Sequence, residues 1–203
     1  MSEARPDPAV SGSAVPDPIL IEVPETISTE RLLLAAPRPG IGPALSVAVA
    51  ESIGLLSPWM PWAQQVPSFE ESEAVARRQQ ADFIARRDLC YQIYDRAPEG
   101  RRLLGGIGLH RMDWTVRRFE IGYWLRASAQ GQGFMSEAVT ALSRMAFEQL
   151  RARRVEIRMD ETNLASRAVA ERCGFELEGI LRCDSLSPQG EPRNTCVYAR
   201  LGL

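Results

Sequence analysis

The sequence predicts an α/β or α+β fold built around one core. Helical and strand patterns are mixed along the chain, and a strand–loop–helix–strand unit occupies its middle. The chain has 203 residues, of which 45% are hydrophobic, so it can bury one sizeable core. Residues 1–18 contain four prolines among small and charged residues and cannot bury enough apolar area to fold alone. We therefore expect a disordered tail over 1–18 and a single domain over 19–203.

Each element is predicted by a local signal. Prolines and glycines over 39–43 mark the entry to a first helix, and Ser68–Glu71 has capping-box spacing for a second. Runs of β-prone residues between turn residues predict the strands. From Met135 to Leu150 apolar residues recur every three or four positions, which is typical of a helix packed on a sheet. Gly174 is expected to end the last helix as a left-handed cap.

The predicted elements follow one another along most of the chain. They are a strand over 29–35, helices after 43 to about 51 and over 68–87, strands over 90–95, 103–112 and 118–125 with a turn at 97–100, a helix over 135–150, a strand over 155–159, a helix over 164–173, and strands over 176–183 and 194–201.

Charge and hydropathy exclude several function classes. The 24 basic and 26 acidic residues give a formal net charge of −2, without the basic stripe expected of a protein that binds nucleic acid or a membrane surface. No apolar run approaches the roughly 20 residues of a membrane span. The chain also does not begin with the basic and then apolar pattern of a signal peptide. We expect a cytoplasmic protein that contacts neither nucleic acid directly nor a membrane.

The four cysteines do not form a pattern of metal ligands in the sequence. Cys90, Cys173, Cys183 and Cys196 include no C-x-x-C pair, and the single histidine is not at ligand spacing from any of them. The sequence therefore predicts no metal and no redox motif, and reduced, mostly buried thiols.

The segment from Phe119 to Met135 is the most informative part of the chain. It reads as a strand, a tight loop and the start of an amphipathic helix. Gly131 and Gly133 remove Cβ atoms from the loop and let backbone N–H groups point at one small volume. The helix adds its unpaired N–H groups and the positive end of its dipole. We therefore expect an anion cradle that fits a phosphate or pyrophosphate.

The strand before this loop is expected to carry an acid on a glycine-lined face. Side chains alternate between two faces of a strand, so Glu120 and Gly122 share one face. The opposite face carries an apolar set that suits the core: Phe119, Ile121, Tyr123 and Leu125. Gly108 and His110 share one face of the preceding strand. If 113–117 is a hairpin loop, His110 lies opposite Glu120, with Cβ atoms about 4.5–5.5 Å apart. Two other interpretations stay open: a solvated glutamate on an edge strand, and a histidine that only orients its neighbour.

The order and spacing of these motifs resemble the GNAT superfamily of N-acetyltransferases, and within it the RimJ/RimL type, which acetylates ribosomal-protein N-termini. The resemblance runs from about residue 29 to the C-terminus. Its motifs are Thr29–Leu32, Pro58–Trp62, Glu120–Leu125, Gln130–Met135, Asn163, Ser166–Arg172 and Gly174-Phe175. It implies a GNAT-like (acyl-CoA N-acyltransferase) fold: a twisted, mixed, mostly antiparallel sheet with helices on both faces, whose middle strands splay to admit acetyl-CoA.

The resemblance also implies where acetyl-CoA binds. The family pattern Q/R-x-x-G-x-G/A maps onto Gln130, Gly133 and Met135, and Met135 departs from the usual small residue. Amides of this loop would hold the pyrophosphate, and the end of the preceding strand would pair with the pantetheine arm. Asn163 would touch the same arm, although it could equally cap a helix. The implied cosubstrate-binding residues are Trp124, Leu125, Arg126, Gln130, Gly131, Gln132, Gly133, Phe134, Met135 and Asn163.

Three residues are candidates for the chemistry. Glu120, helped by His110, would accept the proton of the attacking amine. By resemblance Ser166 lies near the thiol, and the tyrosine that many GNAT enzymes carry seven positions after the asparagine is Ala170 here. Either Ser166 therefore assists the departing thiolate, directly or through water, or the thiolate leaves without a dedicated acid. An α-amine has a pKa of about 7.7–8.0, so roughly a tenth of it is neutral at pH 7, whereas a lysine amine near about 10.4 needs far more assistance. This comparison favours an α-amine as acceptor.

The sequence thus predicts an acetyl-CoA-dependent N-acetyltransferase that acts on a protein N-terminal α-amine. Two alternatives stay open: acyl transfer to a small amine such as an antibiotic, toxin or polyamine, and a non-catalytic acyl-CoA sensor. A glycine-loop nucleotide binder is disfavoured, because neither G-x-x-x-x-G-K-[ST] nor G-x-G-x-x-G follows a strand. Trp59 and Trp62 are expected either in the core or in the wall of the acceptor pocket. The resemblance is compatible with a homodimer.

Overall fold

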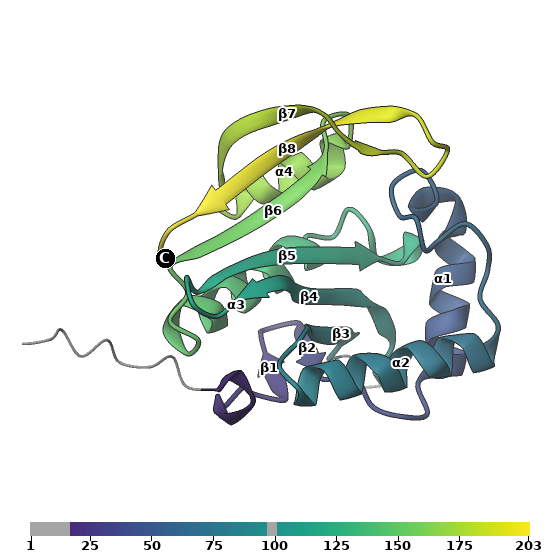
Figure 1. Ribbon diagram of the computed structural model, residues 1–203. Coiled ribbons are helices and arrows are strands. Elements are labelled where there is room, and N and C mark those ends of the chain that lie inside the picture. The colour runs from purple at the N-terminus through teal and green to yellow at the C-terminus, as the bar shows by residue number, and fades with distance from the viewer. Residues whose placement is uncertain (1–16, 97–100) are drawn as a thin grey trace, which may run out of the picture.

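A computed structural model describes residues 17–96 and 101–203 (Figure 1). Within these ranges eight strands form one sheet in the order β1-β2-β3-β4-β5-β6-β8-β7. The strands are β1 (Thr26–Ser28), β2 (Leu32–Ala35), β3 (Leu89–Asp95), β4 (Leu103–Asp113), β5 (Arg118–Leu125), β6 (Arg154–Asp160), β7 (Glu176–Leu186) and β8 (Pro192–Arg200). The helices are α1 (Gly42–Leu56), α2 (Phe69–Ile84), α3 (Phe134–Glu148) and α4 (Leu164–Arg172), with the 3-10 turns η1 (Pro18–Leu20) and η2 (Ala127–Ala129).

Helices cover both faces of this sheet. α3 packs against β1, β2, β4 and β5, and α4 packs against α3 and β6. On the other side α1 packs against β4 and α2 against β3, as Figure 1 shows. The main core between the sheet and α3 includes fully buried Phe119, Leu142 and Val155. The predicted fold class is confirmed. In the described part of the chain, every helix is too short or too polar to cross a membrane.

The sheet divides between β5 and β6. These two strands are parallel, whereas every other neighbouring pair is antiparallel. Their pairing covers only residues 118–120 of β5 and 154–156 of β6, and beyond this point they diverge (Figure 1). From Ile121 to Leu125, β5 pairs with β4 alone. The middle strands therefore splay, as the resemblance implied, and one edge of β5 has no strand beside it among the described residues.

Most predicted elements are present with shifted ends. The capping box of Ser68 and Glu71 is confirmed, and so is the left-handed conformation of Gly174, whose φ is +75°. The predicted strand over 29–35 is wrong in extent, because residues 29–31 connect β1 to β2 and the strand begins only at Leu32. The sequence missed β1, which has only three residues and is too short to show a periodic signal.

Some predictions reach beyond the described residues. The turn expected at 97–100 and residues 1–16 of the expected tail lie outside them. At the other end of that expected tail, η1 begins at Pro18, and Asp17 caps it by accepting a hydrogen bond from the Ile19 amide at 3.1 Å.

Gly105 marks a place where the backbones of β4 and β5 leave no room for a side chain. A Cβ on Gly105 would lie 2.2 Å from the carbonyl oxygen of Trp124. We expect Gly105→Ala to lower the free energy of unfolding by about 1–3 kcal/mol, because the strands must move apart. Gly54→Ala in α1 is the control, since nothing lies within 4 Å of its added Cβ. In urea denaturation, Gly54→Ala should leave the free energy of unfolding unchanged or raise it by up to about 1 kcal/mol. Equal effects of the two substitutions would contradict the close approach.

Candidate active site

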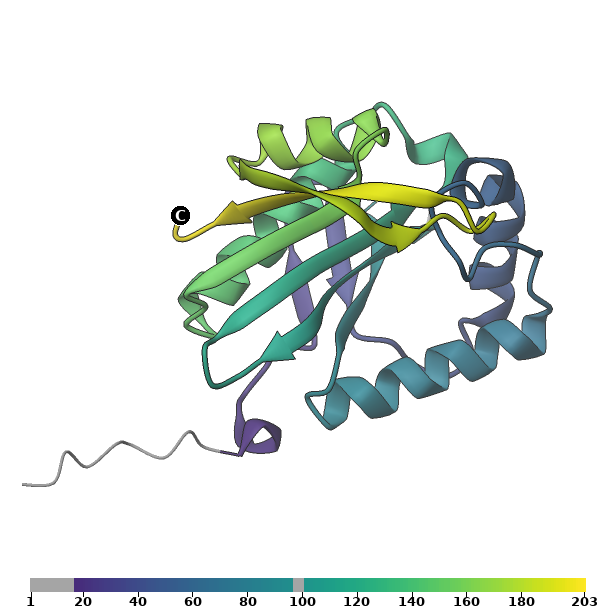
Figure 2. The same cartoon turned by 45° about the horizontal axis from the view of Figure 1, so that its top comes forward.

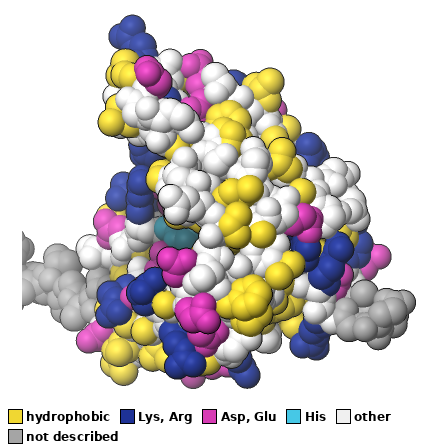
Figure 3. Space-filling view, turned by 90° about the vertical axis from the view of Figure 1, so that its right-hand side faces the viewer, with side chains coloured by type: hydrophobic (Ala, Val, Ile, Leu, Met, Phe, Trp, Pro, Cys, Tyr) yellow, Lys and Arg dark blue, Asp and Glu magenta, His cyan; other side chains and the backbone are white. Residues whose placement is uncertain are grey.

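A cavity of about 980 Å³ opens where the sheet divides. Its lining comes from β3, β4 and β5 on one side, from α2 and the segment before it on another, and from β6, α4 and the β7–β8 hairpin on the third. Figure 2 shows the tip of that hairpin reaching toward α1. Figure 3 views the end of the molecule where α1 and α2 lie, and its surface is hollowed there. Glu120, His110, Trp124, Asn163 and Ser166 all line this cavity.

Tryptophans form part of the cavity wall. Trp59 and Trp62 both line the cavity, and Trp62 is 53% exposed, so it is not a core residue. Its ring meets that of Trp124 edge-on, with centroids 6.0 Å apart. The Trp124 indole lies over Gly106, where an added Cβ would come within 2.7 Å of Nε1. Of the two predicted placements for Trp59 and Trp62, the structure shows the pocket wall.

His110 and Glu120 have the predicted register, since they are directly paired across β4 and β5. The imidazole, however, hydrogen-bonds to Asp88, with Nδ1 2.6 Å from Oδ2. A carboxylate can only accept here, so Nδ1 is the donor, and in a neutral imidazole the lone pair then lies on Nε2. The ring lies over the glycine pair Gly108 and Gly122, where Cβ atoms would approach ring atoms to 3.0 and 2.8 Å. Asp88 was missed because its place depends on the pairing of β3 with β4.

Glu120 is a largely buried carboxylate. Its side chain is 15% exposed, and its Oε2 accepts a hydrogen bond from Arg111 Nη1 at 3.3 Å. Burial raises the pKa of Glu120, and the nearby Glu156 raises it further, while Arg111, Arg158 and His110 oppose the increase. A raised pKa makes this carboxylate a better proton acceptor than an exposed glutamate.

The loop between β5 and α3 presents unpaired amides. Gly131 and Gly133 have φ values of +73° and +78°, in the left-handed region that favours glycine. Within the described ranges, no group accepts a hydrogen bond from the N–H groups of residues 131–136. Nothing lies within 4 Å of a Cβ added at Gly131, so the loop is open on that side. With the N-terminus of α3 at Phe134, these donors fit a pyrophosphate.

Arg31 braces this loop from a distant part of the chain. Its Nη1 donates to the Gln132 carbonyl at 2.9 Å, and its guanidinium forms an ion pair with Glu137 at 2.7 Å. The same guanidinium lies 4.7 Å from the centre of the Phe134 ring. The sequence placed Arg31 in a motif but gave no sign of this contact, because Arg31 and Gln132 are 101 positions apart.

Arg126, expected near the cosubstrate, is instead engaged within the protein. Its amide donates to Leu104, its carbonyl accepts from Ala129, and its guanidinium pairs with Glu51 of α1. Glu51 also accepts from the Ser128 amide at 2.8 Å. Hydrogen bonds from Arg126 and Ser128 lower the pKa of Glu51 to about 2, so this anchor stays charged in any ordinary buffer. Arg126 therefore fixes η2 to α1, and both its backbone N–H and its backbone carbonyl already have partners within the protein.

A hydrogen bond between Tyr123 and Ser166 bridges the gap between β5 and α4. Their hydroxyl oxygens are 2.9 Å apart, and Asn163 caps α4 by accepting from the Ser166 amide at 3.1 Å. Burial raises the pKa of Tyr123 to about 12, so its hydroxyl stays protonated. The sequence missed Tyr123 because strand alternation groups it with the core residues Phe119 and Ile121. At the split, that face of β5 meets α4.

Two buried polar atoms in the cavity wall have no partner among the described residues. They are Ser72 Oγ, from α2, and Gln92 Oε1, from β3. The amide nitrogen of Gln92 donates to Gln79 Oε1 at 3.1 Å, which leaves its oxygen as a free acceptor. Buried polar groups of this kind gain free energy by pairing with a ligand or water. The wall can therefore recognise a polar group as well as an apolar one.

Residues 31–176 match the family described as the acetyltransferase (GNAT) domain. The chain belongs to this family. The Bacillus subtilis (strain 168) relative YdaF, provisionally named a ribosomal N-acetyltransferase, is 40% identical over 99 residues, which cover 49% of this chain and 54% of YdaF. This chain thus matches about half the length of that relative. The ribosomal-protein-serine acetyltransferase of Escherichia coli (strain K12) is 32% identical over 61% of this chain and 69% of its own.

Solved acetyltransferase structures extend the likeness to nearly the whole fold. RimL, a ribosomal L7/L12 α-N-protein acetyltransferase solved in complex with coenzyme A, superposes with a TM-score of 0.81 and 28% identity, over 88% of this chain and 98% of RimL. The microcin C7 self-immunity acetyltransferase MccE, solved with acetyl-CoA and AMP, gives a TM-score of 0.80 over 88% of this chain and 97% of MccE. At 23% identity, MccE shows the shared fold alone.

Proposed function

We propose that this GNAT protein transfers the acetyl group of acetyl-CoA to a primary amine, and that the acceptor is a protein N-terminal α-amine. We further propose that residues 19–203 form its one N-acetyltransferase domain. The observation that carries the proposal is the open loop of unpaired amides at the start of α3, next to a divided sheet whose cavity contains Glu120. The relatives named for ribosomal-protein acetylation support the choice of acceptor.

The protein's own groups fit the cosubstrate in two places. Amides of residues 131–136 bind the pyrophosphate, and the unpaired edge of β5 at Trp124 and Leu125 accepts the pantetheine arm. Asn163 lies across the split and lines the same cavity. Acetyl-CoA supplies an acetyl group already activated as a thioester. The protein mainly holds the reactants in line, which can contribute on the order of 7–11 kcal/mol to the lowering of the barrier.

Proton transfer falls to residues on both sides of the split. The amine nitrogen forms a bond to the acetyl carbon as the carbon–sulfur bond breaks. Glu120 accepts the amine proton, directly or through water, and the Nε2 lone pair of His110 is a second acceptor on the same face. On the sulfur side the Ser166 hydroxyl, oriented by its hydrogen bond to Tyr123, donates a hydrogen bond to the departing thiolate, which takes up a proton from solvent.

The basicity of an α-amine and the side chains of the cavity wall both favour this acceptor. About a tenth of an α-amine is neutral at pH 7, so one carboxylate with a raised pKa suffices as the base. Trp59 and Trp62 provide apolar wall, and the unpartnered Ser72 and Gln92 oxygens provide polar recognition for a peptide's first residues. Acyl transfer to a small amine and acyl-CoA sensing remain the alternatives.

A thiol-release assay tests the proposal. Acetyl-CoA and succinyl-CoA are each presented with a panel of N-terminal peptides, the same peptides blocked at the α-amine but carrying lysine, and small amines including polyamines and aminoglycosides. We expect release with acetyl-CoA and unblocked peptides, and little with blocked ones. Turnover only with small amines would overturn the α-amine acceptor. Tight binding of acetyl-CoA without turnover on any amine would favour the sensor.

Removing either hydroxyl of the Tyr123–Ser166 pair should slow the reaction modestly. We expect Tyr123→Phe and Ser166→Ala each to lower kcat several-fold with little change in KM. That is less than the roughly 10²–10⁴-fold typical of proton transfer, because a thiol of pKa about 8.5 leaves readily. Since Tyr123 acts through Ser166, the double variant should be no slower than the slower single variant. Tyr198→Phe removes a buried hydroxyl that bonds to Glu171 and is the control. If the effects of Tyr123→Phe and Ser166→Ala on kcat add up in the double variant, Tyr123 does not act through Ser166.

A further inference from the structure

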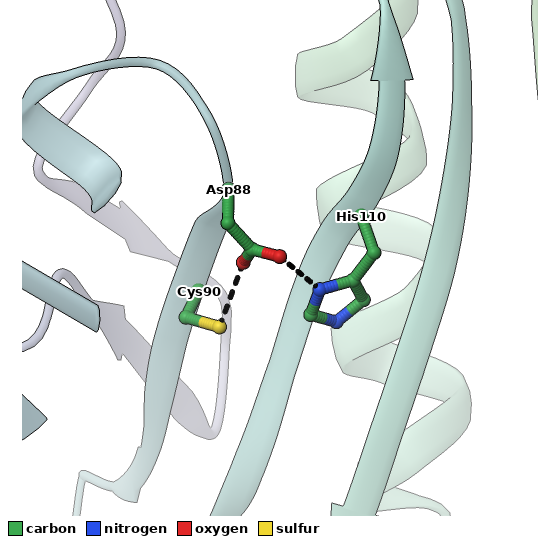
Figure 4. A group of neighbouring side chains, drawn as sticks. All are labelled: Asp88, Cys90 and His110. Atoms are coloured by element: carbon green, nitrogen blue, oxygen red, sulfur yellow. Dashed lines mark hydrogen bonds and ion pairs between the residues drawn. The ribbon is translucent and has the colours of Figure 1, made fainter. Parts of the chain in front are cut away.

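Three side chains with metal-binding atoms meet at the rim of the cavity: Asp88, Cys90 and His110 (Figure 4). His110 Nδ1 lies 2.6 Å from one carboxylate oxygen of Asp88, and Cys90 Sγ lies 3.0 Å from the other. All three ligand atoms are within 4.8 Å of one another. Cys90 and His110 line the cavity, so solutes can reach the cluster from it.

The sheet register explains why the cluster forms. Leu89 pairs with Leu109, and Cys90 with Gly108, so one further step of the antiparallel pairing brings Asp88 opposite His110. Asp88 and Cys90 are two positions apart and therefore face the same side of the sheet. Because Gly108 has no side chain, the space opposite Cys90 is left to the imidazole. The cluster is thus built on paired strands, which hold ligands more rigidly than a loop does.

We propose that Asp88, Cys90 and His110 bind one Zn²⁺ ion, with the fourth coordination position open toward the cavity. Tetrahedral zinc has bonds of about 2.3 Å to sulfur and about 2.0–2.2 Å to nitrogen and oxygen, which separates its ligand atoms by about 3.2–3.6 Å. The ligand atoms now lie between 2.6 Å and at most 4.8 Å from one another, so side-chain shifts of about 1 Å suffice. A thiolate, an imidazole and a carboxylate together favour Zn²⁺ over Mg²⁺ or Ca²⁺, which take oxygen ligands.

Zinc binding releases one proton to solvent and moves a second proton within the His110 ring. The Cys90 thiol releases its proton to solvent as sulfur bonds to zinc. The His110 proton moves from Nδ1 to Nε2, so that Nδ1 can bind the ion, and Asp88 stays a carboxylate. The hydrogen bonds from His110 and Cys90 to Asp88 are replaced by bonds to the metal.

Zinc at this position would also remove a proton acceptor from the cavity. With its proton on Nε2, His110 can no longer accept a proton at that atom. Zn²⁺ should therefore inhibit acetyl transfer. This inhibition rests on the proposed function, whereas the binding itself does not.

Cobalt spectroscopy tests the site without any need for activity. The purified full chain, freed of tags and metal, is titrated with Co²⁺. We expect one equivalent to produce a thiolate-to-cobalt charge-transfer band and the intense visible bands of four-coordinate cobalt, and Zn²⁺ to displace them. Cys90→Ser should abolish the charge-transfer band. It should weaken Zn²⁺ binding by more than the roughly 10–100-fold seen when only a partner of a ligand is lost.

Cys183→Ser is the matched control, because Cys183 is exposed on β7 and is not part of the cluster. It should keep the band unchanged. Absence of the band in the wild-type chain, or its loss in Cys183→Ser rather than Cys90→Ser, would overturn the site. In a chain active in the thiol-release assay, Zn²⁺ should inhibit the wild type more strongly than Cys90→Ser. Failure of the proposed function would leave the spectroscopic result intact.

Discussion

Glu120→Gln is expected to lower kcat about 100-fold at pH 7, near the lower end of the roughly 10²–10⁴-fold typical of general bases. The lower end applies because part of an α-amine is already neutral at that pH. The loss should grow as pH falls and neutral amine becomes scarce. It should then shrink once the pH drops below the pKa of Glu120, because the protonated acid cannot accept. Since burial raises that pKa, the shrinkage begins at a higher pH than for an exposed glutamate.

Glu156→Gln is the matched control for this substitution. Glu156 pairs with Glu120 across β5 and β6, is 9% exposed and bonds to Arg154, but it does not line the cavity. The Glu156→Gln substitution should leave kcat near the wild-type value. It should move the acid limb of the pH–rate profile to lower pH, because the charge of Glu156 raises the pKa of Glu120 in the wild type. A Glu120→Gln enzyme with a wild-type pH–rate profile would remove Glu120 from the mechanism.

Gly131→Val should raise the KM for acetyl-CoA by about 10-fold to 100-fold. A β-branched residue disfavours the φ of +73° at this position, so the backbone rotates and at least one amide leaves the anion site. A hydrogen bond to a charged group contributes about 1.5–3 kcal/mol, and every 1.4 kcal/mol corresponds to a factor of ten. Calorimetric titration with coenzyme A should show the same loss of affinity.

Gly190→Val separates strain from binding. Gly190 has a φ of +87°, and like Gly131 it has nothing within 4 Å of an added Cβ, but it lies in the turn between β7 and β8. Both substitutions should destabilise the protein to a similar extent in thermal unfolding. Only Gly131→Val should change the KM for acetyl-CoA. An unchanged KM in Gly131→Val would show that the loop amides do not bind the cosubstrate.

The sequence predicted the features that depend on residues close together along the chain. The glycine loop, the capping box at Ser68 and the register of His110 with Glu120 follow from neighbouring residues and a short hairpin, and local rules suffice for them. The family resemblance supplied the divided sheet, which no local pattern encodes.

The contacts of the site that the sequence missed all need pairings between distant segments. Asp88 reaches His110 only through the β3–β4 register, and Arg31 reaches Gln132 only because β2 lies near α3. Tyr123 was assigned to the core because alternation gives the face of a side chain but not what covers that face. Here that face is covered by α4, and the hydroxyl of Ser166 in α4 shares a hydrogen bond with the hydroxyl of Tyr123.

The short β5–β6 pairing has a mechanical consequence. Among the described residues, three residue pairs make up the ladder that joins the half-sheet of β1–β5 to the half-sheet of β6–β8. A pantetheine chain lying along the unpaired edge of β5 would contact both halves of the sheet, and a ligand that binds only the folded state raises the free energy of unfolding. The protein with acetyl-CoA bound should therefore be more rigid than the free protein, and each release of coenzyme A should let the two halves move again.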